Sequence, residues 1–279
     1  MEEDKKENIE KDTEKEFGKI EDTLFVPMLG RIYATENFPN ILNDKTAINI
    51  KERLPKDIKG KDTQTQYTLL AGAARSSNMD RYIKRFIEEN ENGVIVQLGC
   101  GLETTFHRNN NGKTKFYEVD LPNVIEYRKG IFEENALEKL ISCSALSEDW
   151  IKEIRKENPE SPIMIIAGGL LYYFKEEEMY EVFKFLKKYG NIEIVFDIFN
   201  KQGMKSVKRY MKQVGHEDAK MYFYVENIDK LKKDTGYEDI SEEAYYKYID
   251  KKGLKLITKL TMKISDMFMI VKMIHMKNH

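Results

Sequence analysis

The sequence contains only two cysteines among its 279 residues, Cys100 and Cys143. Two cysteines cannot build a disulfide framework, and these two do not have the paired spacing of a zinc motif. No apolar run approaches the ~20 residues needed to cross a bilayer. The best stretch, Met267 to Ile274, is broken by Lys272. We therefore expect a cytoplasmic protein in a reducing compartment, with no metal site and no membrane partner.

The sequence also lacks an excess of charge of one sign. Its 46 Lys and Arg residues nearly balance 48 Asp and Glu residues, for a formal net charge of −2. This balance gives no overall attraction to nucleic acid, so we expect no nucleic-acid partner. Residues 1–22 are almost all polar or charged, with no apolar signal core. This tail is too polar to fold alone and should be frayed or a solvated helix, whereas residues 23–279 should form a single domain.

The chain is organised around the stretch from Val94 to Thr104. An apolar, β-rich run enters a turn with two glycines, Gly99 and Gly101, and a second such run ends on Asp120. Strand, glycine turn, helix, strand and acid form the start of a nucleotide-binding α/β sheet. The acid at the tip of the second strand is placed to accept hydrogen bonds from ribose hydroxyls.

The third glycine of the dinucleotide-binding fingerprint is missing, because Thr104 stands in its place. That glycine allows close packing of helix and strand beside a pyrophosphate. A branched residue there argues against NAD or FAD and favours an adenosine ligand without a pyrophosphate. S-adenosylmethionine is the commonest such ligand. The alternative is an ordinary β-turn-α connection whose glycines serve packing alone.

Later segments extend the α/β pattern. The run from Ile163 to Ala167 has the continuous apolar character of a central parallel strand, and Gly168-Gly169 follows at its carboxyl tip, where such sheets bind ligands. We expect two cap segments, near residues 23–75 and 201–250. We also expect two final strands around a short turn, Gly253 to Leu260 and Met267 to Ile274.

Five segments carry a family resemblance: Thr23-Leu24-Phe25-Val26-Pro27, Ile41-Leu42-Asn43-Asp44, Gln97 to Thr104, Tyr117-Glu118-Val119-Asp120-Leu121-Pro122 and Ala167-Gly168-Gly169-Leu170-Leu171-Tyr172-Tyr173. Together they resemble the leucine carboxyl methyltransferase family. Within it, the sequence looks most like the bacterial branch that includes polyketide O-methyltransferases.

The resemblance implies a class I methyltransferase fold. This is a Rossmann-like α/β domain whose seven-stranded sheet is mostly parallel with a terminal antiparallel strand, plus a helical cap. It further implies that S-adenosylmethionine is the cofactor and S-adenosylhomocysteine the product. The expected reaction is methylation of oxygen, on a carboxylate or hydroxyl of a small molecule or on a peptide carboxylate.

The resemblance also assigns roles to individual residues. It implies that Gly99 and Gly101 line the methionine part of the cofactor, and that Asp120 holds the ribose hydroxyls. Further expected cofactor contacts are Arg75 to the cofactor carboxylate, Ala145 and Leu146 beside the adenine, and Cys100, Leu121 and Gly168. Arg31 lies near a basic residue of the family that faces substrate or cofactor.

Three positions depart from the family pattern. Glu103 stands where the family usually has Asp, and Thr105 where the bacterial branch often has Arg. At the tip of the fourth strand Gly168 replaces a Glu that sits beside the cofactor in the family. Its loss could alter cofactor affinity or substrate choice, and it leaves room for a non-catalytic relative that only binds the cofactor.

The sequence offers no obvious general base. The best candidate is His216 in the expected cap, while Tyr222 and Tyr224 could hydrogen-bond the acceptor or wall it in, and a surface or core role is the alternative for each. A carboxylate acceptor, with a pKa near ~4, needs no base, whereas a phenol near ~10 does. The missing base therefore favours a carboxylate. An NAD-dependent oxidoreductase is the rival enzyme, and Thr104 argues against it.

Overall fold

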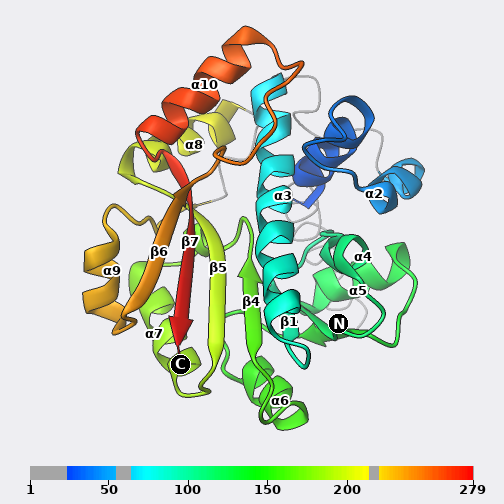
Figure 1. Ribbon diagram of the computed structural model, residues 1–279, viewed down its shortest axis with the longest axis vertical. Coiled ribbons are helices and arrows are strands. Elements are labelled where there is room, and N and C mark those ends of the chain that lie inside the picture. The colour runs from blue at the N-terminus through cyan, green and yellow to red at the C-terminus, as the bar shows by residue number, and fades with distance from the viewer. Residues whose placement is uncertain (1–23, 55–63, 214–219, 279) are drawn as a thin grey trace, which may run out of the picture.

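The computed structural model describes residues 24–54, 64–213 and 220–278, so the charged tail 1–22 lies outside the described part. At its centre is a seven-stranded sheet with strand order β3-β2-β1-β4-β5-β7-β6 (Figure 1). The strands are β1 (Val94–Leu98), β2 (Phe116–Asp120), β3 (Glu138–Ser142), β4 (Ile163–Ala167), β5 (Ile192–Phe199), β6 (Asp239–Ala244) and β7 (Val271–Asn278).

The first five strands are parallel, and β7 pairs antiparallel with both β5 and β6. Strands β1 and β4 are buried along their whole length, because helices cover both faces of the sheet. This explains their continuous apolar sequences, which parallel central strands require. The expected class I methyltransferase sheet is confirmed.

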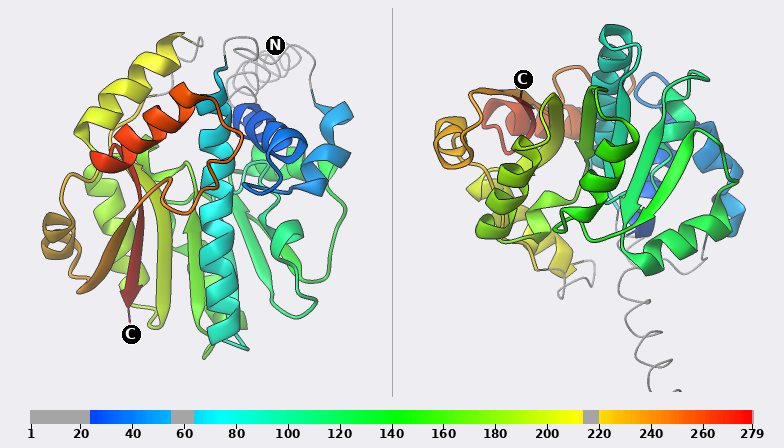
Figure 2. Two further views of the ribbon diagram at one scale, coloured as in Figure 1. Left: turned by 45° about the horizontal axis from the view of Figure 1, so that its top comes forward. Right: turned by 90° about the horizontal axis from the view of Figure 1, so that it is seen from below.

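Helices flank the sheet in two layers, as Figure 2 shows from below. One face packs against α6 (Asp149–Glu157), α7 (Glu176–Lys187) and α9 (Ile228–Thr235). The other packs against α3 (Gln66–Glu89) and α10 (Leu256–Met267). The remaining helical elements are a helix over residues 24–37, then α2 (Lys45–Asn49), η1 (Lys51–Arg53), α4 (Thr105–Asn109), α5 (Pro122–Ile131), η3 (Leu171–Tyr173) and α8 (Lys201–Gln213). No helix among the described residues combines the length and apolarity needed to span a membrane.

The expected strand over Gly253 to Leu260 is wrong, because residues 256–260 form the first part of α10. Leu254, Leu256 and Leu260 fall on one side of the alternating pattern that a strand would have, yet the buried positions Thr258, Met262 and Ser265 follow helical spacing. The strand beside β7 is instead β6, which lies inside the range 201–250 expected as a cap.

The helix over residues 24–37 crosses α3 at close range. A Cβ on Gly30 would overlap the backbone carbonyl oxygen of Leu69 in α3, whereas a Cβ on Gly72 would lie 3.6 Å from Pro27, an ordinary contact. The lack of a side chain at Gly30 therefore sets how closely the two helices approach. This contact fixes the N-terminal helix above the carboxyl edge of the sheet.

We expect Gly30→Ala to destabilise the protein by about 2 kcal/mol, because backbone must move to admit the methyl group. Gly72→Ala, in the same helix pair, is the matched control. It should stabilise by about 0.5 kcal/mol or more, since a helical glycine costs unfolded-state entropy. Urea unfolding of both variants measures the difference, and equal effects would contradict the close approach at Gly30.

Candidate cofactor and acceptor site

The turn after β1 requires its two glycines. Gly99 and Gly101 have φ of +66° and +45°, in the left-handed region that favours glycine. A Cβ on Gly99 would lie 2.7 Å from the side chain of Leu170, and one on Gly101 would lie 2.9 Å from that of Leu24. The Gly99 N–H donates to the carbonyl of Val119 in β2 at 2.8 Å. The positive φ strains any residue with a Cβ at both positions, and the neighbouring leucine side chains would also have to move.

Asp120 ends β2 directly beside this turn. Its carboxylate accepts hydrogen bonds from the backbone N–H groups of Gly101 and Leu121, each at 2.8 Å. Burial raises the pKa of Asp120, although these two N–H donors act in the opposite direction. A carboxylate has about four acceptor sites, so it can still bind ribose hydroxyls.

The loop after β3 lies at the same edge. The Cys143 N–H donates to the Asp120 carbonyl at 2.9 Å, and the Ala145 carbonyl accepts from the indole of Trp150 at 3.3 Å. Ala145 and Leu146 are half-buried here, while Leu121 is exposed. The structure thus gathers the residues expected near ribose and adenine at one sheet edge.

A hollow of 120 Å³ opens at the glycine turn. Its lining includes the expected residues Arg31, Arg75, Gly99, Cys100, Gly101 and Gly168. The space that the glycines leave at the turn, Asp120 beside it and a cation at the far wall agree with the chemistry of S-adenosylmethionine, which carries a ribose and a carboxylate.

Arg75 forms the far wall of this hollow. Its Nε donates to the buried carboxylate of Asp197 at 2.9 Å, and Asp197 also accepts the Gly169 N–H at 2.6 Å. A Cβ on Gly168 would lie 3.1 Å from Cδ of Arg75. The glycine at 168 thus makes room for Arg75, and Asp197 on β5 supplies a carboxylate to the same loop. The sequence did not predict a role for Asp197. An acidic residue near the end of an expected strand was the feature that could have pointed to it.

A second cavity of 390 Å³ lies beyond Arg75. It shares Pro27, Arg75, Tyr172 and Tyr173 with the smaller hollow, so the two spaces meet at these side chains. Most of its wall is aromatic or aliphatic: Val26, Tyr67, Ala71, Phe199, Val207, Tyr210, Met211, Met221, Tyr245, Tyr246, Ile270 and Val271. These residues come from widely separated segments, so the sequence alone does not show that they surround one cavity.

The other expected residues lie elsewhere. Tyr222 and Tyr224 are partly exposed and line a separate hollow of 130 Å³ with Tyr180 and Lys230. They do not line either space described above. His216 lies outside the described residues.

Several tyrosines of the large cavity are buried. Burial raises the pKa of Tyr172, Tyr173 and Tyr245, which disfavours a role as a base, and the Tyr245 hydroxyl already donates to the Ala71 carbonyl at 2.9 Å. The described residues that line this cavity include no histidine, and their only carboxylate is Asp197, already bonded to Arg75.

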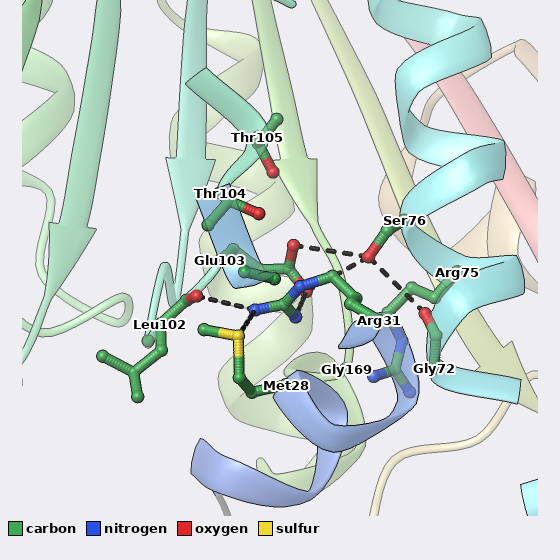
Figure 3. A network of polar contacts seen from close by, with 12 residues as sticks. Met28, Arg31, Gly72, Arg75, Ser76, Leu102, Glu103, Thr104, Thr105 and Gly169 are labelled. Atoms are coloured by element: carbon green, nitrogen blue, oxygen red, sulfur yellow. Dashed lines mark hydrogen bonds and ion pairs between the residues drawn. The ribbon is translucent and has the colours of Figure 1, made fainter. Parts of the chain in front are cut away.

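Arg31 is buried in the wall of the hollow, and its guanidinium group is bonded to neighbouring residues (Figure 3). Its Nη1 donates to Glu103 at 2.6 Å and its Nη2 to the Leu102 carbonyl at 2.7 Å. Its Nε reaches Asp44 at 3.2 Å, and Met28 Sδ lies 3.3 Å from Nη2. All three guanidinium nitrogens are engaged, so Arg31 ties the N-terminal helix to the turn.

Thr104 belongs to the same buried network. Its hydroxyl bonds the carboxylate of Asp44, which also pairs with Arg108 at 3.2 Å. Burial alone would raise the pKa of Asp44, but Arg108, Arg31 and Thr104 together lower it. The residue that replaces the third glycine of a dinucleotide fingerprint thus anchors the turn through its hydroxyl.

A second arginine holds the turn from the other side. Arg128 Nη1 donates to the carbonyls of Glu103 at 2.7 Å and Gly101 at 3.2 Å. Glu118 is fully buried 3.6 Å from Arg128 Nη2, and neither of its carboxyl oxygens has a hydrogen-bond partner among the described residues. Burial raises the pKa of Glu118, although the Arg128 guanidinium acts in the opposite direction.

Comparisons with known proteins also indicate a methyltransferase. The sequence model of the leucine carboxyl methyltransferase family matches residues 20–187. Tetracenomycin polyketide synthesis O-methyltransferase TcmP from Streptomyces glaucescens is 25% identical over 166 residues, which span 59% of this chain and 60% of that relative. A DUF574 family protein from Streptomyces avermitilis shares the fold, with a TM-score of 0.58 at 11% identity over 90% of this chain and 97% of that one. The chain therefore belongs to the leucine carboxyl methyltransferase family, whose methyltransferases depend on S-adenosylmethionine.

Proposed function

We propose that the protein is an O-methyltransferase that transfers a methyl group to the carboxylate of a small, largely apolar molecule. The observation that carries this proposal is the 390 Å³ cavity, which meets the cofactor hollow at Arg75 and offers no base. The relative TcmP supports it, since its name describes an O-methyltransferase of polyketide synthesis.

In this proposal the residues of the turn bind and orient the cofactor. Gly99, Cys100 and Gly101 surround its methionine part, Asp120 accepts hydrogen bonds from its ribose, and Leu121, Ala145 and Leu146 lie near its adenine. Arg75, held in place by Asp197, pairs with its carboxylate. The expected contact at Gly168 becomes indirect, because the stem of Arg75 covers that glycine.

The cofactor supplies an electrophilic methyl group on a sulfonium. The acceptor carboxylate oxygen forms the new C–O bond as the C–S bond breaks, and the electron pair stays on sulfur. No proton moves, so the protein's contribution is to align the two partners and exclude water. The buried tyrosines Tyr172 and Tyr173, which line both spaces, can hold the acceptor by hydrogen bonds and aromatic contacts.

A peptide carboxylate is less suited to this cavity, because its mainly apolar wall offers few partners for peptide groups. A relative that binds the cofactor without catalysis is the second candidate. Gly168 favours it, since the family carboxylate is absent there. Asp197 argues for activity, because it returns a carboxylate to the same loop. An NAD-dependent oxidoreductase is disfavoured by Thr104.

The test distinguishes a methyl ester from a methyl ether, because mild alkali hydrolyses only the ester. The protein is incubated with S-adenosylmethionine carrying a tritiated methyl group and with aromatic and aliphatic carboxylic acids, each paired with its phenol or alcohol analogue. We expect label in the acids alone, released as methanol by mild alkali, as an ester requires. Alkali-stable label in the hydroxyl analogues would move the acceptor to hydroxyls. Tight S-adenosylhomocysteine binding with no transfer to any acceptor would favour the non-catalytic candidate.

A further inference from the structure

Helix α10 turns its apolar side away from the protein. Its buried positions are Thr258, Met262 and Ser265, of which two are small and polar. Six large apolar side chains at and just after the helix are between 40% and 82% exposed: Leu256, Ile257, Leu260, Ile264, Met267 and Phe268. They make up most of the exposed large apolar side chains of the described residues. We call them the α10 apolar face.

Helical spacing gathers these side chains on one side. Positions 256, 260, 264 and 267 recur every three to four residues, and at about 100° per residue all six fall within about a third of the helix circumference. Continuous exposed apolar surface of this kind marks an interaction site rather than ordinary surface. Figure 2, left, shows α10 on the outside of the molecule, in front of the sheet.

Positive charge lies along one border of the α10 apolar face and at its N-terminal end. Lys259 and Lys263 lie one turn apart along its border, and Lys251, Lys252 and Lys255 precede it. Across residues 251–270 the only acid is Asp266, and its carboxylate accepts the backbone N–H of Tyr246. The chain as a whole carries a net charge of −2, so this concentration of cations is local.

Helix α8 adds to this charge. It carries five cations, Lys201, Lys205, Lys208, Arg209 and Lys212, and no acid. Its N-terminal end lies against the end of α10, since Asn200 Nδ2 donates to the Phe268 carbonyl at 2.9 Å and a Cβ on Gly203 would overlap the carbonyl oxygen of Ile270. The two helices lie side by side at the top of Figure 1.

We infer that α10, with α8 beside it, binds an anionic lipid surface, with the α10 apolar face inserted among the acyl chains near the headgroups. An amphipathic helix with bulky apolar residues on one face and lysines along the border is the form that lies in a membrane interface. The lysines pair with anionic headgroups. A second copy of this chain fits less well, because it would bring two sets of cations together.

This inference differs from the expectation of no membrane partner. That expectation rested on overall charge balance and on the lack of a long apolar run, which detect nucleic-acid binders and membrane-spanning helices. Neither measure detects a helix that lies on a membrane, since such a helix has a low mean hydropathy and a local charge. The inference stands apart from the proposed methyl transfer, because no residue of the α10 apolar face lines the two cavities.

The test is sedimentation of the full chain with vesicles of phosphatidylcholine alone or mixed with phosphatidylglycerol. We expect binding to the mixed vesicles that weakens as salt rises. Leu260→Gln with Ile264→Gln removes the centre of the apolar face, and Lys259→Glu with Lys263→Glu reverses its border charge. Each pair should weaken binding by about tenfold or more. All the changed residues are at least partly exposed, and thermal melts check that the variants remain folded.

The matched control is Lys152→Glu with Lys156→Glu. This pair has the same spacing on α6, at the opposite end of the sheet, and should leave binding nearly unchanged. An equal loss in the control would overturn the inference, as would failure of the unaltered protein to bind mixed vesicles at low salt. Sedimentation velocity measures the oligomeric state and so tests the alternative that the face binds a second copy of this chain. A dimer that is abolished by the glutamine pair would assign the face to a second copy instead.

Discussion

Asp120→Ala should weaken S-adenosylhomocysteine binding by about 100-fold, which is about 2.7 kcal/mol. Under the proposed function the alanine removes the charged acceptor of two ribose hydroxyls, and hydrogen bonds to charged groups are the strong ones. It also removes the hydrogen bond that the Gly101 N–H donates to this carboxylate at 2.8 Å, so the glycine turn is held less firmly. Calorimetric titration of the unaltered protein and the variant measures both affinities.

Two further variants sharpen this result. Asp120→Asn keeps one acceptor oxygen for the turn but loses the charge, so we expect an intermediate affinity. Glu126→Ala removes an exposed carboxylate from α5 and should bind as the unaltered protein does. Unchanged affinity in Asp120→Ala, with the variant still folded by circular dichroism, would place the ribose elsewhere.

Arg31→Met should destabilise the fold by about 3 kcal/mol or more. The substitution keeps an apolar stem but removes every bond from the guanidinium, including those to Glu103 and Asp44. Asp44 is fully buried and Glu103 mostly so, and breaking a buried ion pair leaves charges without compensation. Urea unfolding at neutral pH gives the free energy of unfolding.

The control is a neighbouring ion pair in contact with water. Lys51 and Glu36 are 2.7 Å apart, but both side chains are nearly half exposed, so Lys51→Met should cost no more than about 1 kcal/mol. Adding Glu103→Gln to Arg31→Met should recover part of the loss, because it removes one of the orphaned charges. A cost for Arg31→Met as small as that for Lys51→Met would show that the buried network does not stabilise the fold.

The cofactor half of the site could be predicted because its signals are local. Two glycines with positive φ and an acid at the next strand tip lie within about 20 residues, and parallel strands bring those tips together without further information. The family resemblance also pointed to Arg75 as a cofactor contact. Its partner Asp197 lies 122 residues away, and only packing shows that the two meet.

The acceptor cavity could not be predicted in this way. Its tyrosines 67, 172, 210 and 245 come from four separate segments, and a buried tyrosine in a wall has the same sequence pattern as one in a core. The elements at the end of the chain, β6 and α10, were predicted wrongly for a related reason. The alternating apolar residues of α10 suggested a strand, because its apolar side faces outward, while β6 is polar enough to pass for a loop.

The position of β7 has a consequence for synthesis on the ribosome. This strand follows the other six in sequence, yet it lies between β5 and β6. Strands β5 and β6 leave the ribosome before β7 does. Until β7 is available, their unpaired edges can pair with another chain. The sheet closes only when residues Val271–Asn278 have left the exit tunnel. This half of the sheet therefore completes late, and a nascent chain that stalls before Val271 keeps strand edges that can pair with another chain.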